Sequence, residues 1–426
     1  MLDIRRLRAE TEAVTDALAR RDGSLPVAVD RVLALDEGRR EAIGEVNELK
    51  AKRNEASKRV GEMKRAGENA DDLIAETRAL GTRIDTLDDV VRSADEQIRT
   101  ILLEVPNLPL DPVPEGDESA NEIHSEWGEP ATFDFDPQPH WDLAEALGVL
   151  DLPRGAKVAG SGFPLLRGAG ARLQRGLINF FLDVHTGEHG YTELRVPYLI
   201  NPESMLGTGQ LPKFAVESYH TEQDGLWLLP TAEVPVTNLH RDEILELDDL
   251  PVRYTAYSPC FRREAGAAGK DTRGLLRVHQ FDKVELVRYE LPERSLEALE
   301  ELTREAEVLL ERLGLTYRRV VLATGDLGQS GAMTYDLEVW APGVETWLEV
   351  SSCTTFTDYQ ARRANLRFRR SQADKPEFVH TLNGSALALP RVVAALLETY
   401  QDEDGAVTLP DVLHPYVGSE RLEPSS

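Results

Sequence analysis

The sequence predicts an α+β fold, in which an antiparallel sheet with helices follows a long antiparallel α-helical coiled-coil arm. Three observations predict it. Apolar residues recur in alternating steps of four and three through the N-terminal quarter, which is the coiled-coil heptad pattern. In the C-terminal part, several short β-like runs follow one another without a helix between them, which favours an antiparallel sheet over a doubly wound parallel one. Four prolines within residues 105–116 separate the two patterns, because proline ends a helix and stiffens a linker.

Two heptad runs form the predicted arm. The first extends from Val32 to Met63 and the second from Leu73 to Ile101. Thirty residues of helix span about 45 Å. Three polar residues interrupt the apolar positions: Arg39, Arg53 and Thr77. Turn-forming residues stand between the runs: Gly61, Gly67 and Asn69. The simplest interpretation is two long helices that fold back on one another.

Charge is distributed unevenly along the chain. The 426 residues include 48 Lys and Arg against 75 Asp and Glu, a net charge of −27 that argues against a general nucleic-acid binder. Residues 50–65 nevertheless carry a net charge of +5. We call the basic side chains of this window the basic cluster: Lys50, Lys52, Arg53, Lys58, Arg59, Lys64 and Arg65. Two interpretations are open: a solvated helix face, which charge runs usually are, or a surface that contacts nucleic-acid phosphates.

The C-terminal part has the pattern of a mixed domain. Amphipathic spacing predicts helices at 172–184, 295–313 and 390–400. Apolar and β-branched runs predict strands at 191–196, 226–229, 253–263, 277–287, 317–322, 335–340 and 346–352. We therefore divide the chain into a helical arm (1–104), a proline-rich linker with a lead-in (105–164) and a C-terminal domain (165–426).

Composition excludes several classes of protein. The chain has two cysteines, Cys260 and Cys353, too few for a disulfide framework or a cysteine-built zinc site. No signal peptide and no stretch long enough to span a bilayer are evident. We therefore expect a soluble cytoplasmic protein, with no membrane partner.

One segment imitates a zinc-protease motif. His185-Thr-Gly-Glu188-His189 matches the H-x-x-E-H pattern, in which both imidazoles must project from one helix. Here Gly187 and Gly190 interrupt the segment. We interpret it as a polar helix end, keep the protease as a minor alternative and expect no structural zinc.

Charged and aromatic side chains are concentrated on two successive predicted strands. Because strand side chains alternate between faces, Arg277, His279, Phe281, Lys283 and Glu285 are expected to share one face. Arg262 and Glu264 are expected to share a face of the preceding strand. Arginine binds phosphate oxygens bidentately, an aromatic ring can stack on a planar base, and a carboxylate can hold an ammonium group. A charged outer face with cross-strand ion pairs is the alternative, but it does not explain an aromatic ring among the charges.

Several segments of the sequence, taken in order, resemble the motifs of a known family. Phe261-Arg262-x-Glu264 with Arg277-x-x-x-Phe281 resembles motif 2 of the class II aminoacyl-tRNA synthetases. Gly190-Tyr-x-Glu193-x-x-x-Pro197 resembles motif 1, and Asn383-Gly-Ser385-Ala-Leu-Ala-Leu-Pro-Arg391 resembles motif 3. Within the class, the chain is most similar to the bacterial type of seryl-tRNA synthetase, through Gly207–Lys213, Pro230–Pro235, Arg273–Glu285, Phe378–Ser385 and the long arm.

The resemblance implies a role for individual residues. It implies a serine site of Thr231, Ala232, Glu233, Glu285 and Ser385. It implies an ATP site of Arg262, Arg263, Glu264, Val278, Phe281, Glu349, Val350, Ser351, Ser352 and Arg391. Arg262 and Arg391 would be catalytic, and Glu349 with Ser352 would hold Mg²⁺ with the ATP. The basic cluster would bind tRNA(Ser) and also tRNA(Sec), and motif 1 implies a homodimer.

Two features of the site follow from the strand geometry and from the family pattern. Glu349 and Ser352 are three residues apart, so an ideal strand would direct them to opposite faces, and we expect a bulge or strand end between them. The sequence departs from the usual family pattern at Arg263, Ala386 and Pro390.

The resulting expectation is an ATP-dependent serine–tRNA ligase. Two alternatives stand beside the zinc protease. A paralogue that loads an amino acid onto a carrier protein would acylate the carrier but never tRNA. A catalytically inactive RNA-binding or scaffold protein would bind tRNA without forming an adenylate.

Overall fold

A computed structural model describes residues 1–265 and 273–424 of the chain. The chain divides into two compact units. One comprises Leu2–Pro106, and the other comprises Asn107–Ser426 together with Met1. Each unit has its own architecture and is described by itself.

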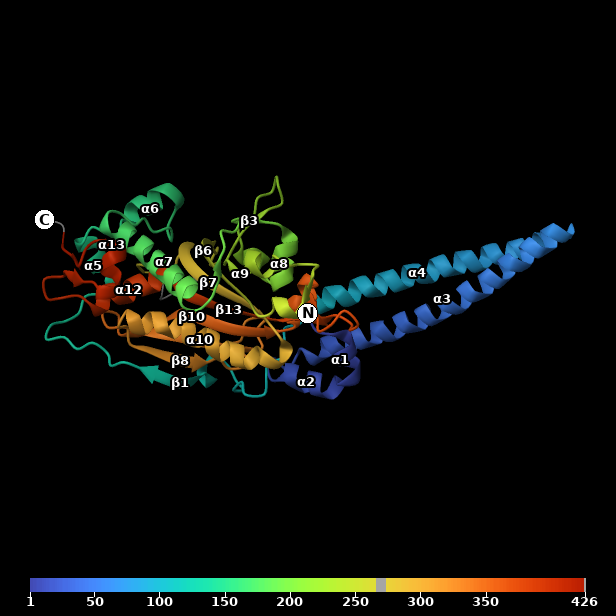
Figure 1. Ribbon diagram of the computed structural model, residues 1–426, viewed down its shortest axis with the longest axis horizontal. Coiled ribbons are helices and arrows are strands. Elements are labelled where there is room, and N and C mark those ends of the chain that lie inside the picture. The colour runs from blue at the N-terminus through green and yellow to red at the C-terminus, as the bar shows by residue number, and fades with distance from the viewer. Residues whose placement is uncertain (266–272, 425–426) are drawn as a thin grey trace. The chain divides into compact units, whose positions relative to one another are not determined.

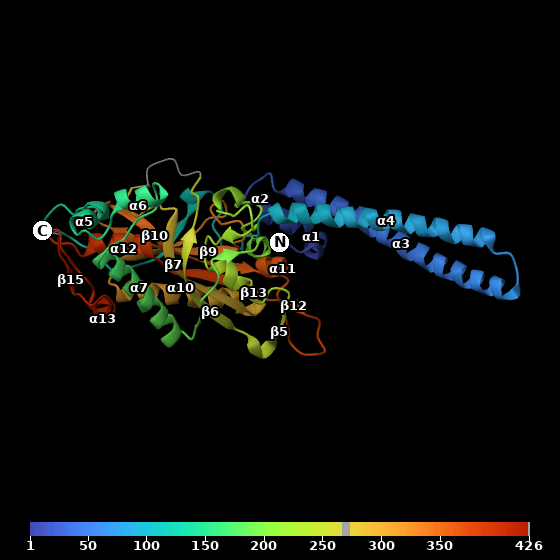
Figure 2. The same cartoon turned by 90° about the horizontal axis from the view of Figure 1, so that it is seen from above.

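The first unit is helical throughout. It contains α1 (Ile4–Ala9), α2 (Thr11–Ala19), α3 (Pro26–Ala66) and α4 (Asp71–Glu104), and the two long helices lie side by side and antiparallel in both views (Figures 1 and 2). The heptad positions from Val32 to Met63 and from Leu73 to Ile101 are all buried or half-buried. The predicted coiled-coil arm is therefore confirmed. Its 41-residue and 34-residue helices are about 60 Å and 50 Å long at the usual rise per residue.

The connection between α3 and α4 differs slightly from the prediction. Gly67 ends α3 in the left-handed conformation, at φ +76°, and its N–H and that of Glu68 cap carbonyls of the last helical turn. Asn69 accepts a hydrogen bond from the N–H of Asp71 at 2.8 Å. Gly61, in contrast, lies inside α3, so the prediction that it belongs to the turn is wrong. A single glycine costs a helix only about 1 kcal/mol, and forty neighbouring positions outweigh it.

A buried carboxylate explains one of the polar heptad positions. Asp36 is fully buried in the arm, and three guanidinium groups surround it: Arg8 at 3.4 Å, Arg39 at 2.7 Å and Arg40 at 3.1 Å. Arg39 also reaches Asp95 of α4 at 2.7 Å. The arginine that interrupts the apolar seam is thus part of an ion-pair network that joins α1, α3 and α4.

The second unit is built on an eight-stranded sheet, as the sequence predicted. The strand order is β1-β8-β9-β10-β13-β7-β6-β2, and every neighbouring pair is antiparallel except β2 and β6. The strands are β1 (Glu122–Trp127), β2 (Thr192–Glu193), β6 (Val252–Phe261), β7 (Gln280–Glu290), β8 (Tyr317–Val321), β9 (Met333–Ala341), β10 (Thr346–Thr357) and β13 (His380–Ala388). Smaller sheets pair β3 (Leu199–Ile200) with β4 (Trp227–Leu228), β5 (Ile244–Glu246) and β12 (Glu377–Phe378) with β11 (Arg367–Arg369), and β14 (Val407–Thr408) with β15 (Arg421–Leu422).

Helices pack against this sheet and complete the core. The long ones are α7 (Ala169–Gly187), α10 (Ser295–Arg312) and α12 (Leu389–Thr399), which lie along the sheet (Figure 2). Apolar side chains of all three belong to the buried core. The shorter ones are α5 (His140–Ala146), α6 (Leu152–Ala159), α8 (Pro202–Thr208), α9 (Glu233–Thr237), α11 (Tyr359–Ala364) and α13 (His414–Val417). In the part of the chain that the structure describes, no helix is both long and apolar enough to cross a membrane.

Several predicted elements have different bounds in the structure. The strands predicted at 191–196 and 226–229 shorten to two residues each, as β2 and β4. The strand predicted from Arg277 begins only at Gln280, because residues 273–279 form turns. Residues 105–164, which we described as a proline-rich linker and lead-in, contain β1, α5 and α6. Their short apolar runs carry too little periodicity to be recognised in sequence.

Candidate active site

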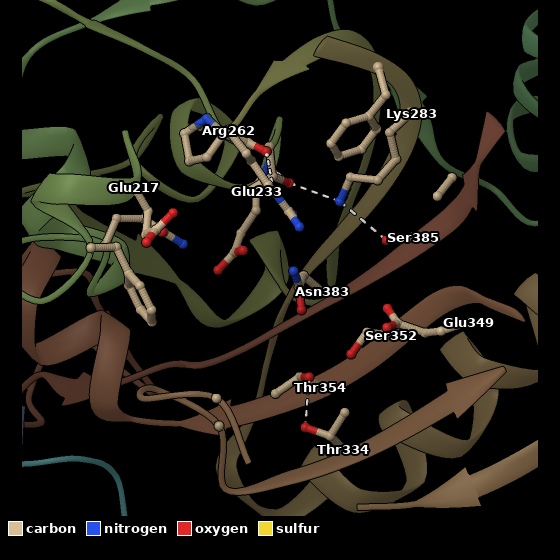
Figure 3. A pocket seen from close by; sticks show the side chains of 18 of the residues that line it. Glu217, Glu233, Arg262, Lys283, Thr334, Glu349, Ser352, Thr354, Asn383 and Ser385 are labelled. Atoms are coloured by element: carbon tan, nitrogen blue, oxygen red, sulfur yellow. Dashed lines mark hydrogen bonds between the residues drawn. The ribbon is translucent and has the colours of Figure 1, made fainter. Parts of the chain in front are cut away.

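A cavity of about 780 Å³ opens over the central strands of the sheet. Strands β7, β9, β10 and β13 contribute to its lining, together with Arg262 and Glu264 beyond the end of β6 and with segments around residues 208–218, 230–233, 275–278 and 328–331. Most of the predicted site residues line it: Thr231, Glu233, Arg262, Glu264, Val278, Phe281, Glu349, Val350, Ser352, Ser385 and Arg391. Figure 3 shows the charged and hydroxyl side chains converging on this space from different strands.

Four predicted residues are not part of the lining. Ala232 and Glu285 are fully buried behind it. Ser351 is also buried, and its hydroxyl donates to the carbonyl of Ser385 at 2.6 Å. Arg263 is exposed and donates its backbone N–H to the carbonyl of Glu217 at 2.8 Å. Adjacent residues in a motif therefore divide between the cavity wall, the interior behind it and the exposed surface.

Lys283 is the central residue of a polar cluster at one end of the cavity. Its ammonium donates to the Ser385 hydroxyl at 3.2 Å (Figure 3). It also donates to the Thr231 hydroxyl at 3.0 Å and forms an ion pair with Glu285. The amide of Asn383 donates to the same Glu285 carboxylate at 2.9 Å. The three predicted serine-binding side chains of this cluster are thus connected by a lysine that sequence reasoning did not assign to the site.

Glu233 extends the cluster and is electrostatically unusual. It is buried, its carboxylate accepts a hydrogen bond from Gln360 at 2.7 Å, and the backbone N–H of Glu233 donates to the Thr231 hydroxyl. Burial, with the nearby Glu285 carboxylate adding to it, raises the pKa of Glu233 to about 7. A carboxyl group with this pKa changes charge close to neutral pH, which makes it a candidate for substrate binding.

An arginine and an aromatic ring face each other across two strands. In the antiparallel pair of β6 and β7, Cys260 lies opposite Phe281, and the guanidinium of Arg262 stands 5.2 Å from the centre of the Phe281 ring. The predicted pairing of these strands is confirmed.

The predicted face of the second strand is wrong at its start. Arg277 and His279 precede β7. Arg277 instead pairs with Glu264 at 2.8 Å, and Glu264 adopts the left-handed conformation beyond the end of β6. The imidazole of His279 contacts the carbonyl of Arg262 at 3.1 Å.

The opposite wall of the cavity carries the predicted metal-binding oxygens. The pairing of β10 with β9 shifts by one residue between Glu349 and Ser351. The expected bulge is therefore confirmed, and it lets Glu349 and Ser352 line the same cavity. Arg391, on α12, donates to the carbonyl of Glu349 at 2.6 Å and lies 3.5 Å from its carboxylate.

Comparison with known proteins places this geometry in a family. A model of the seryl-tRNA synthetase N-terminal domain matches residues 1–109, and a model of the tRNA synthetase class II core domain (G, H, P, S and T) matches residues 214–400. A serine–tRNA ligase of Geobacillus kaustophilus is 54% identical over 420 residues, which cover 98% of this chain and 99% of that protein. This chain belongs to the seryl-tRNA synthetase family. A serine–tRNA ligase of Gemmatimonas aurantiaca is 56% identical over 98% of the chain and 99% of its own length.

A solved structure extends the likeness to three dimensions. The seryl-tRNA synthetase of Pyrococcus horikoshii, crystallised with ATP, superposes with a TM-score of 0.95 at 39% identity, and the match covers 100% of both chains. The predicted class II synthetase fold and the resemblance to seryl-tRNA synthetases are therefore confirmed.

The donor groups of this synthetase site fit Mg²⁺. Glu349 and Ser352 offer oxygen ligands, which a hard cation prefers. Asp336, opposite Ser352 in the β9–β10 pair, is buried, and its Oδ1 atom has no hydrogen-bond partner. Burial raises the pKa of Asp336 well above its usual value, and the nearby Glu349, Glu338 and Asp326 carboxylates add to the effect. Such an excess of negative charge is the environment that a divalent cation relieves.

The zinc-protease pattern does not form a catalytic site in this fold. Helix α7 ends at Gly187, and Glu188 pairs with Arg312 through two contacts of 2.6 Å. His185 is buried, which lowers its pKa to about 3. Across residues 1–265 and 273–424, no group of three or more His, Cys, Asp or Glu side chains is placed to hold a metal ion. Glu188 is thus committed to a structural ion pair rather than to general-base work.

Sequence reasoning missed several residues of the synthetase site. Lys283 lies between Phe281 and Glu285 at alternate strand positions. The alternation of side chains along the strand therefore already predicted that Lys283 shares a face with these two site residues. Gln360 and Asp336 carried no such signal. Gln360 reaches Glu233 across 127 residues of sequence, and Asp336 lies opposite Ser352 only because the β9–β10 register shifts at the bulge.

Proposed function

We propose that the chain activates L-serine with ATP to form seryl-adenylate and transfers the seryl group to the 3′ end of tRNA(Ser) and of tRNA(Sec). One observation carries this proposal most directly. In a single cavity, the Lys283 cluster lies along β7 from the Arg262–Phe281 pair and across from Glu349 and Arg391. An amino-acid site, a planar-base site and a phosphate site are thereby adjacent.

The serine half is the polar cluster around Lys283. Glu233 and Glu285 supply negative charge for the substrate ammonium, while Thr231 and Ser385 supply hydroxyl groups. A site that hydrogen-bonds the serine hydroxyl leaves its own polar groups unpaired when alanine binds, a penalty worth up to about 10⁴-fold. Threonine has the hydroxyl but adds a methyl group, so exclusion by size is required.

The nucleotide half holds the reacting phosphates. In the first step a carboxylate oxygen of serine forms a bond to the α-phosphorus of ATP, and the bond to the β-phosphate oxygen breaks to release pyrophosphate. Arg262 and Arg391 would offset the repulsion between these anions, and Phe281 would stack on adenine. Little proton transfer is needed, so these side chains act by positioning and electrostatics. Glu349 and Ser352 would hold Mg²⁺, which, when bound, neutralises phosphate charge.

The second step and the assembly of the enzyme complete the proposal. A terminal ribose hydroxyl of the tRNA would attack the acyl carbon and release AMP. The arm (1–104) would bind the tRNA through the basic cluster, whose side chains are exposed or half-exposed on α3, and residues 165–426 would be the catalytic domain, with 105–164 leading into it. Motif 1 would form a homodimer interface, and the reaction would take place in the cytoplasm.

The decisive experiment is ATP–pyrophosphate exchange across a panel of amino acids, with Mg²⁺ and without tRNA. We expect exchange with serine alone, followed by serine attachment to tRNA when tRNA is added. Exchange with serine but acylation only of a carrier protein would support the carrier-loading alternative. Absence of exchange, with tRNA binding retained, would replace the proposal by the scaffold alternative.

A further inference from the structure

A short segment of irregular backbone supplies part of the nucleotide half of the cavity. Residues 273–279 lead into β7 and form turns, and four of them line the cavity: Leu275, Leu276, Arg277 and Val278. A segment without a strand or helix ladder must satisfy its buried backbone groups elsewhere. What holds this segment therefore determines how precisely it contacts a nucleotide.

His140, at the start of α5, holds the segment through a backbone hydrogen bond. The N–H of Leu275 donates to Nε2 of His140 at 3.1 Å, and Nδ1 of the same imidazole lies 2.7 Å from Oε1 of Glu398. His140 and Glu398 are both fully buried, and Leu275 nearly so. Because a backbone N–H can only donate, Nε2 is the unprotonated nitrogen and Nδ1 donates to the carboxylate. The imidazole thus links the carboxylate of Glu398 to the backbone of Leu275 through two hydrogen bonds, and fixes the position of Leu275 relative to Glu398.

Glu398 is itself rigidly placed. Besides the imidazole, its carboxylate accepts the N–H groups of His140 at 2.9 Å, Gly343 at 2.8 Å and Val344 at 3.2 Å. It belongs to α12, the helix that also carries Arg391. The Nε atom of Arg391 donates to the carbonyl of Leu276 at 3.2 Å. The same helix therefore fixes two successive residues of the segment, one directly and one through His140.

Close packing makes the contact with His140 specific. Gly274 has φ +67°, and a Cβ atom added there would lie 2.4 Å from Nε2 of His140. The preceding guanidinium, of Arg273, stacks on Trp141 at 4.5 Å from the ring centre. The segment thus approaches α5 as closely as backbone permits, and any larger residue would displace it.

We propose that His140 is a positioning residue for ATP, which sets the backbone of residues 275–278 against the nucleotide. The inference rests on the proposed function, since it assigns the adjacent half of the cavity to ATP. If His140 has this role, loss of the Nε2 acceptor weakens ATP binding. Serine binding stays unchanged, because the polar cluster around Lys283 makes no contact with His140.

Two substitutions test the Nε2 acceptor and the Nδ1 donor of His140 separately. In His140→Gln the side-chain oxygen can reach the Nε2 position and still accept from Leu275. In His140→Asn the amide nitrogen can occupy the Nδ1 position and still donate to Glu398, but the N–H of Leu275 loses its acceptor. Leaving a buried N–H unsatisfied costs enough for about a tenfold loss of affinity. We expect the KM for ATP in serine-dependent pyrophosphate exchange to rise about tenfold in His140→Asn and less than threefold in His140→Gln, with the KM for serine unchanged in both.

A glycine pair tests the same contact without altering His140. Gly274→Ala should raise the KM for ATP as His140→Asn does. Gly225→Ala is its matched control, because Gly225 has φ +65° but no atom within 4 Å of an added Cβ. It should leave both KM values unchanged.

The outcomes distinguish this inference from the proposed function. Equal effects of His140→Asn and His140→Gln on ATP, or equal rises in the KM for ATP and for serine, would overturn the positioning role. Calorimetric titration with ATP alone gives an independent measurement. If the unaltered enzyme showed no serine-dependent exchange, the proposed function would fail, yet weaker ATP binding by the Asn variant than by the Gln variant would still support the role of His140.

Discussion

Replacing Lys283 by methionine tests whether the polar cluster is held together by a buried ion pair. The side chain of Lys283 is 6% exposed and that of Glu285 is 0% exposed, so Lys283→Met leaves a carboxylate without its counter-ion in a nearly dry site. Breaking a buried pair from one side costs about 3–5 kcal/mol. The hydrogen bond from Asn383 to Glu285 survives the change, so the low end, about 3 kcal/mol, is expected. For a unit of this size, that corresponds to a fall in Tm of about 4 °C.

The assay combines thermal unfolding with pyrophosphate exchange. We expect Lys283→Met to lower the Tm and to raise the KM for serine, because Thr231 and Ser385 lose the donor that orients their hydroxyl groups. Adding Glu285→Gln removes the unpaired charge, so the double variant should regain most of the stability. It should not regain serine activation, because the negative charge proposed to attract the substrate ammonium is then absent.

A double-mutant cycle gives the result that would refute this reasoning. If Lys283→Met and Glu285→Gln lower the free energy of unfolding additively, the two side chains do not form a coupled buried pair. If Lys283→Met costs less than about 1 kcal/mol, the cluster is solvated like an exposed ion pair. Either result would remove the electrostatic basis for the serine half of the cavity.

Three further predictions concern the pH profile, the cation and the arm. Burial raises the pKa of Glu233 to about 7, so kcat/KM for serine should rise as the pH increases through about 7, and Glu233→Gln should flatten the profile in that range. The same shift predicts a loss of stability as the pH rises from about 4.5 to about 7, since the Glu233 carboxyl ionises freely in the unfolded chain over this range while burial keeps it protonated in the folded one. Ser352→Ala should raise the Mg²⁺ concentration for half-maximal exchange about tenfold, whereas Ser371→Ala, at an exposed hydroxyl that bonds only Asp374, should not. Neutralising four residues of the basic cluster should raise the KM for tRNA and reduce the salt dependence of charging, with exchange unchanged: Lys58, Arg59, Lys64 and Arg65. Equal loss of exchange and charging would show that the arm acts through folding instead.

Much of the fold could be predicted because its patterns are local. Heptad spacing identified both long helices to within a few residues, since each position of a coiled coil depends on neighbours three and four residues away. The separation of Glu349 and Ser352 predicted a bulge, because two ligands of one cavity cannot face opposite sides of a strand. The order of motifs 1, 2 and 3 along the chain was enough to indicate the family, although the order of the strands in the sheet was not known.

What could not be predicted depends on tertiary packing. Asp36 looks like an ordinary exposed acid in the heptad pattern, yet three arginines from different turns and helices bury it. Residues 277–279 were predicted as the start of β7. Instead, residues 273–279 form turns whose hydrogen bonds go to α5, to α12, to Gly162 and, at His279, to Arg262 beyond the end of β6. His140 gave no signal at all, because its partners are 135 and 258 residues away in sequence.

The alternation of β7 has a consequence for how this enzyme can diverge. Phe281, Lys283 and Glu285 occupy every second position of one strand, so about 13 Å of pleated backbone separates the proposed adenine contact from the proposed amino-acid contact. Inserting or deleting one residue between them would turn one of the two side chains to the opposite face of the sheet. A change of amino-acid specificity must therefore arise by substitution around Glu285, while the length of the strand stays constant. The nucleotide contact and the spacing that brings both substrates together would be inherited intact.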